Sequence, residues 1–223
     1  MRLRSLLPQI HILVGLEAEF IRPEYASHVA KLISDPRVDY FIGSVHHVHS
    51  IPIDYDAGMY AAAVAASNDS EEQLWEDYYD LQYEMLTALK PRVVGHFDLI
   101  RLLASDPARD IREWKGAWSK AQRNLKLAAE QGGWLECNTA ALRKGLAEPY
   151  PGRVIAEEWL RLGGKFTLSD DSHGIGHVAT NYAKGVDYLL SLGIKDVWTL
   201  RRRDDGKIED VAVSLDKIRK QFD

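Results

Sequence analysis

The chain has 223 residues, of which 46% are hydrophobic, and 28 lysines and arginines against 33 aspartates and glutamates give a net charge of −5. This size suffices for one domain with a substantial core, which we expect over residues 1–223. The acidic balance excludes the basic face typical of nucleic-acid-binding proteins, and no apolar run approaches the roughly 20 residues of a membrane span. The lone Cys137 excludes an internal disulfide and favours a reducing compartment. We therefore expect a cytoplasmic protein without nucleic-acid or membrane partners.

Apolar runs alternate with amphipathic stretches in the first half of the chain. We expect strands over residues 10–16, 40–45 and 91–95, and helices over 24–34, 58–66 and 70–89. A long loop with three histidines is expected over 45–57. Ser70 and Gln73 have the spacing of a capping box, which predicts that the helix over 70–89 begins there.

The same alternation continues in the second half. We expect helices over 111–131, 153–161, 178–192 and 214–221, and strands over 134–137, 165–168 and 196–200, with an edge strand over 207–213. Repeated β-then-α units predict a mostly parallel sheet, either closed as a barrel or open and doubly wound.

Polar residues with metal-binding side chains follow four of the expected strands. They are Glu17, His46, His96 and the pair Asp171 and His173. Active sites of α/β folds lie at the carboxyl ends of their strands. These five residues therefore predict one metal site built from distant parts of the chain, and ligands from several strand ends favour the barrel.

The mixture of histidine and carboxylate predicts the class of metal. It suits Zn²⁺, Mn²⁺ or Fe²⁺, whereas an all-oxygen set would indicate Mg²⁺ or Ca²⁺. A carboxylate such as Glu17 can bridge two ions, and the nucleophile would be a metal-bound water rather than a protein group. Each residue alone has another interpretation: a loop histidine, a buried acid at Glu17, or a helix cap at Asp171. The joint pattern favours the metal site.

These residues lie in motifs that resemble the PHP (polymerase and histidinol phosphatase) superfamily. The sequences of these motifs most resemble those of the histidinol-phosphatase branch, particularly its fungal members. The motifs are Gly15-Leu16-Glu17, Gly43-Ser44-Val45-His46-His47, Val94 to Arg101, Glu136 to Thr139 with Leu142 to Gly145, and Leu168 to His173.

The resemblance implies a distorted (β/α)₇ TIM-like barrel with up to three metal ions, Zn²⁺ foremost. It implies hydrolysis of L-histidinol phosphate to L-histidinol and phosphate in histidine biosynthesis. Glu17 would bridge two metals, His46 and His96 would complete the second, and Asp171 and His173 would bind the first and third. Arg143 would bind the substrate phosphate, for which a planar guanidinium is well shaped; a solvated loop arginine is the equal alternative.

One departure from the family pattern modifies these expectations. The family begins with a strand carrying His-x-His, and no such motif precedes Glu17 here. We expect the first one or two βα units to be missing, fewer bound metals, and low phosphatase activity. Unpaired strand edges would then favour homodimerisation. The alternatives are a non-catalytic PHP-like remnant that binds metal and another phosphoesterase of the superfamily, such as a polymerase-linked exonuclease.

Overall fold

The centre of the structure is a five-stranded parallel sheet. The computed structural model describes residues 2–7, 9–203 and 205–222. The strands follow the order β1 (Gly15–Glu19), β2 (Tyr40–Ser44), β5 (Val93–Val94), β6 (Trp134–Asn138) and β7 (Lys165–Ser169). Strands that are consecutive in the sheet point the same way, so the loops that follow them meet at one edge.

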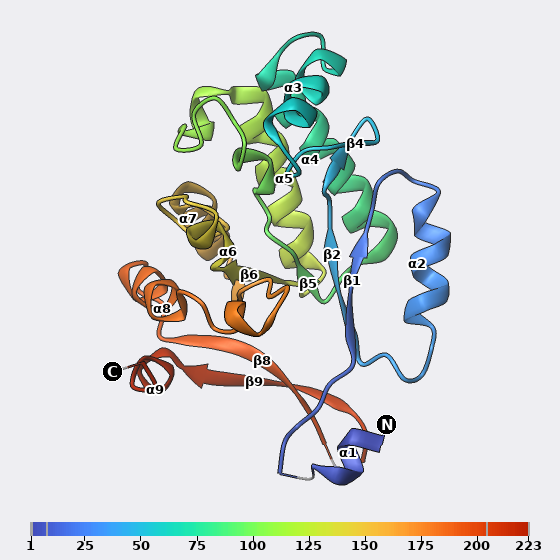
Figure 1. Ribbon diagram of the computed structural model, residues 1–223, viewed down its shortest axis with the longest axis vertical. Helices are drawn as coiled ribbons and strands as arrows, with labels where there is room; N and C mark the ends of the chain where they lie inside the picture. The colour runs from blue at the N-terminus through green and yellow to red at the C-terminus, as the bar shows by residue number, and fades with distance from the viewer. Residues whose placement is uncertain (1, 8, 204, 223) are drawn as a thin grey trace.

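The helices lie outside this curved sheet (Figure 1), and most of them come between two successive strands of the chain. The longer ones are α2 (Tyr25–Ile33), α3 (Ala57–Ala66), α4 (Glu71–Leu89), α5 (Lys115–Glu130), α7 (Arg153–Arg161) and α8 (Tyr182–Ser191). Shorter elements are α1 (Arg2–Leu6), α6 (Ala140–Arg143), α9 (Leu215–Arg219) and the 3-10 turns η1 (Leu99–Arg101), η2 (Ile111–Glu113) and η3 (Ile175–His177). Helix α4 packs on α5, and α5 on α7. The fold is the expected α/β, TIM-like one. Within the described ranges, no helix is long and apolar enough to cross a membrane.

The first strand begins later than the sequence predicts. Residues 10–14 are irregular, so Glu17 is the middle residue of β1 instead of the residue after it, and His11 lies outside the strand. The reason is the buried carboxylate of Asp39, which accepts the backbone N–H of Val14 at 2.7 Å. That donor is therefore used by a side chain before the ladder of β1 and β2 starts.

The predicted loop over 45–57 contains a small hairpin of β3 (His47–Val48) and β4 (Ile51–Pro52). His49 and Ser50 form its turn, with φ angles of 53° and 62°, as a two-residue type I′ turn requires. Nε2 of His49 lies 2.8 Å from the Asp77 carboxylate in α4. This contact ties the hairpin to the helix layer.

Three other predictions need correction at the level of whole elements. The strands expected over 196–200 and 207–213 pair with each other as the antiparallel hairpin β8 (Asp196–Arg202) and β9 (Ile208–Ser214), and neither joins the parallel ladder among the described residues. The helix expected over 178–192 begins only at Tyr182, because Asn181 before it has a left-handed φ of 62°. The helix expected over 111–131 is divided at Trp114 into η2 and α5.

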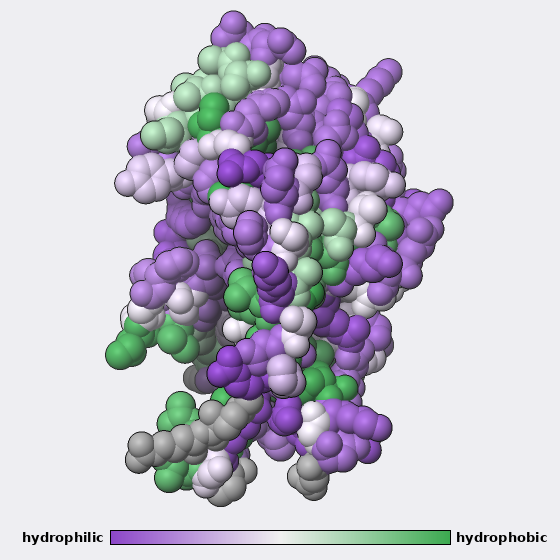
Figure 2. Space-filling view, turned by 90° about the vertical axis from the view of Figure 1, so that its right-hand side faces the viewer, coloured by the Kyte–Doolittle hydropathy of each residue, from purple (hydrophilic) through white to green (hydrophobic). Residues whose placement is uncertain are grey.

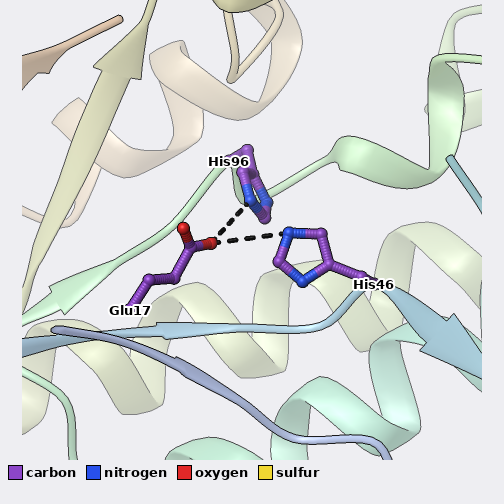
Figure 3. Close-up of side chains that lie close together, drawn as sticks. All are labelled: Glu17, His46 and His96. Carbon is purple, nitrogen blue, oxygen red and sulfur yellow. Dashed lines mark hydrogen bonds and ion pairs between the residues drawn. The ribbon is translucent and has the colours of Figure 1, made fainter. Parts of the chain in front are cut away.

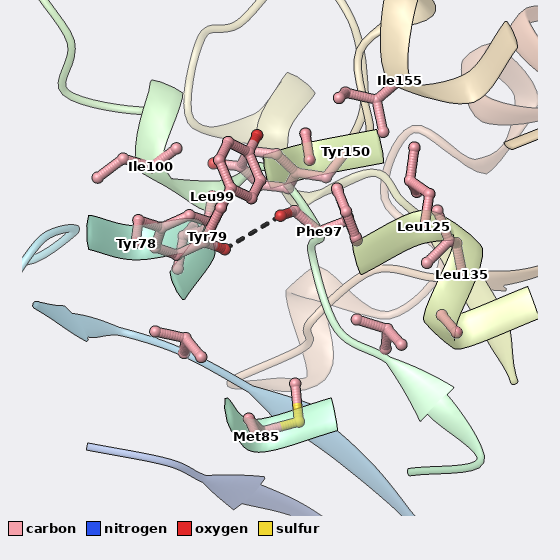
Figure 4. Packing of buried hydrophobic residues seen from close by; sticks show 14 of the residues in the cluster. Tyr78, Tyr79, Met85, Phe97, Leu99, Ile100, Leu125, Leu135, Tyr150 and Ile155 are labelled. Atoms are coloured by element: carbon pink, nitrogen blue, oxygen red, sulfur yellow. Dashed lines mark hydrogen bonds between the residues drawn. The ribbon is translucent and has the colours of Figure 1, made fainter. Parts of the chain in front are cut away.

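The core anchors the segment that follows β5 (Figure 4). The backbone carbonyl of Phe97 accepts hydrogen bonds from the Tyr78 hydroxyl at 3.1 Å and from Nε2 of Gln82 at 2.9 Å. The side chain of Phe97 is fully buried. Cys137 is also fully buried, as expected for a core residue rather than a nucleophile, and burial raises the pKa of its thiol.

Candidate metal centre

Glu17, His46 and His96 meet where the parallel strands end (Figure 3). Glu17 lies in β1, and the two histidines follow β2 and β5, the next two strands of the sheet. Oε1 of Glu17 lies 3.1 Å from Nε2 of His96 and 3.4 Å from Nε2 of His46. One ligand atom from each residue lies within 4.8 Å of the others. The structure thus brings together three of the residues expected to bind metal.

The parallel register explains how residues so distant in sequence converge. Glu17 is opposite Ile42 of β2, and Ile42 is opposite Val93 of β5. The loops after β2 and β5 therefore leave the sheet next to the Glu17 side chain. Gly95 allows the close approach, because a Cβ at this position would lie 2.2 Å from Oγ of Ser44.

Glu19 orients the first histidine, although no sequence motif singled this residue out. Its Oε2 lies 2.5 Å from Nδ1 of His46, and its Oε1 accepts the backbone N–H of the same residue at 3.2 Å. A carboxylate on Nδ1 fixes the tautomer and leaves Nε2 available for a ligand bond. The signal was present in the sequence, because the Glu-x-Glu spacing in a strand places Glu17 and Glu19 on the same face.

The second histidine is held through its backbone. The buried carboxylate of Glu136 in β6 accepts the backbone N–H of His96 at 2.7 Å and the side-chain amide of Asn138 at 2.8 Å. Burial raises the pKa of Glu136 and outweighs the opposing charge of His96. Nδ1 of His96 is buried without a partner in the described part of the chain. The ring is therefore positioned by the backbone contact with Glu136 and by the contact of its Nε2 with Glu17.

Glu17 and His96 shift each other's ionisation. Burial acts to raise the pKa of Glu17, but the hydrogen bond and the positive charge of His96 outweigh it and lower that pKa to about 2. Burial acts to lower the pKa of His96, but the hydrogen bond and charge of Glu17 raise it to about 9. Without a metal, the pair is therefore a carboxylate and an imidazolium. The proton on Nε2 of His96 then lies between this nitrogen and Glu17, where a metal ion would bind.

The donor set fits a divalent metal ion. Two imidazole nitrogens and one carboxylate oxygen suit Zn²⁺, and three protein ligands leave a position for water or substrate. The rings of His46 and His96 are 4.6 Å apart and steeply inclined, so both Nε2 atoms can face the oxygen of Glu17. The cluster thus has the ligand types and the fixed orientation that a metal site requires.

Asp171 and His173 lie after β7 and are not part of this cluster. Asp171 has a left-handed φ of 49°, and its negative charge contributes to the raised pKa of His96. Nδ1 of His173 lies 2.9 Å from the backbone carbonyl of Asp171, and its side chain is 72% exposed. Their roles as metal ligands stay predictions.

Arg143 at the end of α6 reaches the same loop. Its Nη1 donates to the carbonyl of Asp170 at 2.7 Å, and its Nη2 donates to that of Asp171 at 3.0 Å. The guanidinium therefore braces the backbone beside the cluster. Phosphate binding by Arg143 stays a prediction.

Comparison with known proteins identifies the family of this chain. Residues 2–140 match the PHP domain. A probable histidinol-phosphatase of Schizosaccharomyces pombe is 40% identical over 216 residues, which are 96% of this chain and 71% of the relative. The chain belongs to the PHP family.

Further members extend the comparison. The histidinol-phosphatase of Saccharomyces cerevisiae is 35% identical over 81% of this chain and 61% of its own length. A probable histidinol-phosphatase of Deinococcus radiodurans is 30% identical over 87% of this chain and 70% of its own. The chain thus spans between three fifths and three quarters of these PHP relatives. The crystal structure of histidinol phosphate phosphatase from Lactococcus lactis, complexed with zinc, L-histidinol and phosphate, superposes with a TM-score of 0.68 at 20% identity, over 93% of this chain and 76% of that one.

Proposed function

We propose that this PHP chain is a metal-dependent phosphomonoesterase that hydrolyses L-histidinol phosphate to L-histidinol and phosphate in histidine biosynthesis. The observation that carries the proposal is the convergence of Glu17, His46 and His96 at the strand ends. It is supported by 40% and 35% identity to fungal histidinol-phosphatases.

Glu17, His46 and His96 would hold the metal, with Zn²⁺ foremost and Mn²⁺ or Fe²⁺ as alternatives. A bound divalent ion supplies Lewis acidity toward a phosphoryl oxygen and makes a water molecule more acidic. The chain's own contribution is orientation. Glu19 keeps Nε2 of His46 turned toward Glu17, and Glu136 holds the backbone of His96.

Asp171 and His173 are proposed as ligands for further metal ions, and Arg143 as the phosphate-binding cation. All three lie in or against the loop after β7. No protein nucleophile is required, because water attacks phosphorus and the ester oxygen leaves with a proton as the alcohol.

Metal binding without turnover is the second candidate function. It is favoured by the fact that, within the described residues, Asp171 and His173 do not join the three-residue cluster. The two functions are separated by measuring zinc content and phosphate release on the same protein. Release of phosphate from L-histidinol phosphate that depends on added Zn²⁺ and is abolished in His46→Ala supports the phosphatase. Bound zinc without phosphate release supports the alternative.

We also propose that residues 1–223 form one cytoplasmic domain that pairs as a homodimer. One hydrophobic cluster runs from the strands through helices α4 to α8, which supports a single domain. Strand β1 is an outer strand of its sheet, and Leu3, Leu6 and Ile10 near it are 54–61% exposed. On the side shown in Figure 2, hydrophobic residues form separate patches at the upper end, in the middle and toward the lower end of a mostly hydrophilic surface. Light scattering on the purified chain would give a monomer mass if this face stays free.

A further inference from the structure

The ring of Tyr150 lies beside the ring of His96, the buried histidine of the proposed metal centre. The two ring centroids are 6.2 Å apart, and the ring planes are inclined by 74°. This is the edge-to-face arrangement that aromatic rings prefer. Tyr150 is fully buried and belongs to the hydrophobic core (Figure 4). The imidazole of His96 thus has two ring neighbours, Tyr150 and the other clustered histidine, His46.

The two clustered histidines differ in how their rings are held. Nδ1 of His46 lies 2.5 Å from the carboxylate of Glu19, whereas Nδ1 of His96 has no partner among the described residues. A partner on the second ring nitrogen is what usually fixes the orientation of a metal-binding histidine. The hydrogen bond between Nε2 of His96 and Glu17 is given up when both atoms bind a metal. Packing against the ring is then needed to keep its orientation.

The backbone of Tyr150 is fixed at the end of β6. The backbone N–H of Asn138 donates to the carbonyl of Tyr150 at 2.7 Å, and the N–H of Tyr150 donates to the carbonyl of Asn138 at 3.1 Å. The side-chain amide of Asn138 donates to the Glu136 carboxylate, which also accepts the backbone N–H of His96. Tyr150 and His96 are therefore attached to the same strand end.

A buried ion pair holds the segment around Tyr150 from a second direction. Nε of Arg101 donates to Oδ2 of Asp98 at 2.9 Å, and its Nη2 donates to the backbone carbonyls of residues 148–149 at 3.0 and 2.7 Å. The same oxygen of Asp98 accepts the N–H of Gly152 at 2.8 Å. The guanidinium carbon of Arg101 lies 5.1 Å from the centre of the Tyr150 ring. These contacts tie the segment after β5 to the segment that carries Tyr150.

We propose that Tyr150 is a positioning residue of the metal centre. Its ring keeps the imidazole of His96 in one rotamer, with Nε2 directed toward Glu17. The ring carries this role and the hydroxyl does not, because the hydroxyl is buried without a hydrogen-bond partner in the described ranges. The inference rests on the proposed function, since it assigns a role to a residue beside the proposed metal ligands.

The first test is made by NMR on the metal-free chain. Three-bond couplings of Cγ of His96 to its backbone nitrogen and carbonyl carbon report χ1, and the wild type is expected to show one rotamer. Nuclear Overhauser effects should connect the ring protons of His96 and Tyr150. Tyr150→Leu keeps an apolar side chain but removes the ring, so the His96 couplings should become averages over several rotamers. Tyr150→Phe retains the ring and should give the wild-type couplings.

The second test is zinc affinity, measured on the same proteins by competition with a chromophoric chelator. Tyr150→Leu should bind zinc about 10-fold more weakly, as expected when a histidine ligand loses its supporting contact, and Tyr150→Phe should bind it as the wild type does. Tyr60→Leu is the matched control, because Tyr60 is a buried tyrosine of α3 that contacts Glu71 and Trp75. It should lose stability but keep its zinc affinity and the single His96 rotamer.

The outcomes separate this role from general stability and from the proposed function. A single His96 rotamer with wild-type zinc affinity in Tyr150→Leu would overturn the proposal, and so would an equal loss in Tyr60→Leu or in Tyr150→Phe. If Tyr150→Leu does not fold, the wild-type spectra still decide, because averaged couplings or missing Overhauser effects between the two rings contradict the proposal. If the wild type binds no zinc, the proposed function fails, whereas the couplings in the metal-free proteins still test the role of Tyr150.

Discussion

Oε2 of Glu19 lies 2.5 Å from Nδ1 of His46, on the side of the ring opposite to the atom that faces Glu17. The carboxylate therefore determines which ring nitrogen carries the proton. Replacing Glu19 by Gln removes the charge and keeps the size of the side chain, so His46 loses its fixed tautomer. We expect zinc affinity to fall about 10- to 100-fold, measured by competition with a chromophoric chelator. Glu24→Gln, at an exposed position before α2, is the control, and an equal affinity in both variants would contradict this role.

His96 is buried and contributes one of the three ligand atoms of the cluster. Among the described residues of the cluster, no other side chain can supply this atom in its place. His96→Ala should therefore remove most of the zinc from the purified chain, measured by plasma mass spectrometry. His49→Ala is the matched control, since His49 binds Ser67 and Asp77 instead of the cluster. Equal metal content in the two variants would show that the cluster is not the metal site.

The opposite pKa shifts of Glu17 and His96 predict how pH acts on the metal-free chain. The pKa of His96 is raised from 6.5 to about 9, so its contribution to stability is complete below pH 6.5 and is lost as pH rises through about 9. The pKa of Glu17 is lowered from 4.5 to about 2, so its contribution is present above pH 4.5 and is lost as pH falls toward 2. The pair stabilises the fold most between these two unshifted values.

The measurement compares wild type with His96→Gln, because other groups also titrate. Their difference in free energy of unfolding by urea should be larger near about pH 5.5 than near about pH 10. Zinc affinity should change in the opposite direction and rise toward about pH 9, since the metal must displace the proton of His96. A pH-independent difference between the two proteins would refute the coupling.

The sequence predicted the convergence of Glu17, His46 and His96 because parallel strands that follow one another along the chain lie side by side. It did not predict that Glu17 stands inside β1, since the start of that strand depends on Asp39, a residue from another part of the chain. Glu19 was overlooked for a related reason. A carboxylate within a strand is recognised as a histidine partner only when the position of the next loop is known.

The pattern of apolar residues also did not predict that β8 pairs with β9. A run such as Val197 to Leu200 fits a parallel or an antiparallel strand equally well. Its partner is decided by contacts far away in sequence, among them the ion pairs from Arg202 to Asp39 and from Arg92 to Asp210. These contacts place the hairpin across the amino-terminal ends of β2 and β5.

Asp39 is expected to be a major determinant of stability. Its side chain is 2% exposed, and it pairs with Arg4 and with Arg202 while accepting the N–H of Val14. Asp39→Ala leaves these donors without their acceptor and should lower the free energy of unfolding by about 3 kcal/mol, measured with urea. Asp35→Ala, which removes an exposed pair with Arg37, should change it little. Similar losses in the two variants would contradict a special role for Asp39.

Arg143 offers a test of how the loop after β7 contributes to phosphate binding. Arg143→Ala removes two hydrogen bonds to the carbonyls of Asp170 and Asp171 and the cation proposed to bind phosphate. We expect phosphate affinity of the zinc-loaded chain to fall by about 1.5–3 kcal/mol, measured by calorimetry. Arg143→Lys should recover only part of this loss, because an ammonium keeps the charge without the planar pair of donors. Arg161→Ala, which removes an exposed arginine of α7, controls for net charge. If Arg143 only braces the loop, Arg143→Ala will unfold at a lower temperature while its phosphate affinity matches that of Arg161→Ala, and the phosphate-binding role must then be abandoned.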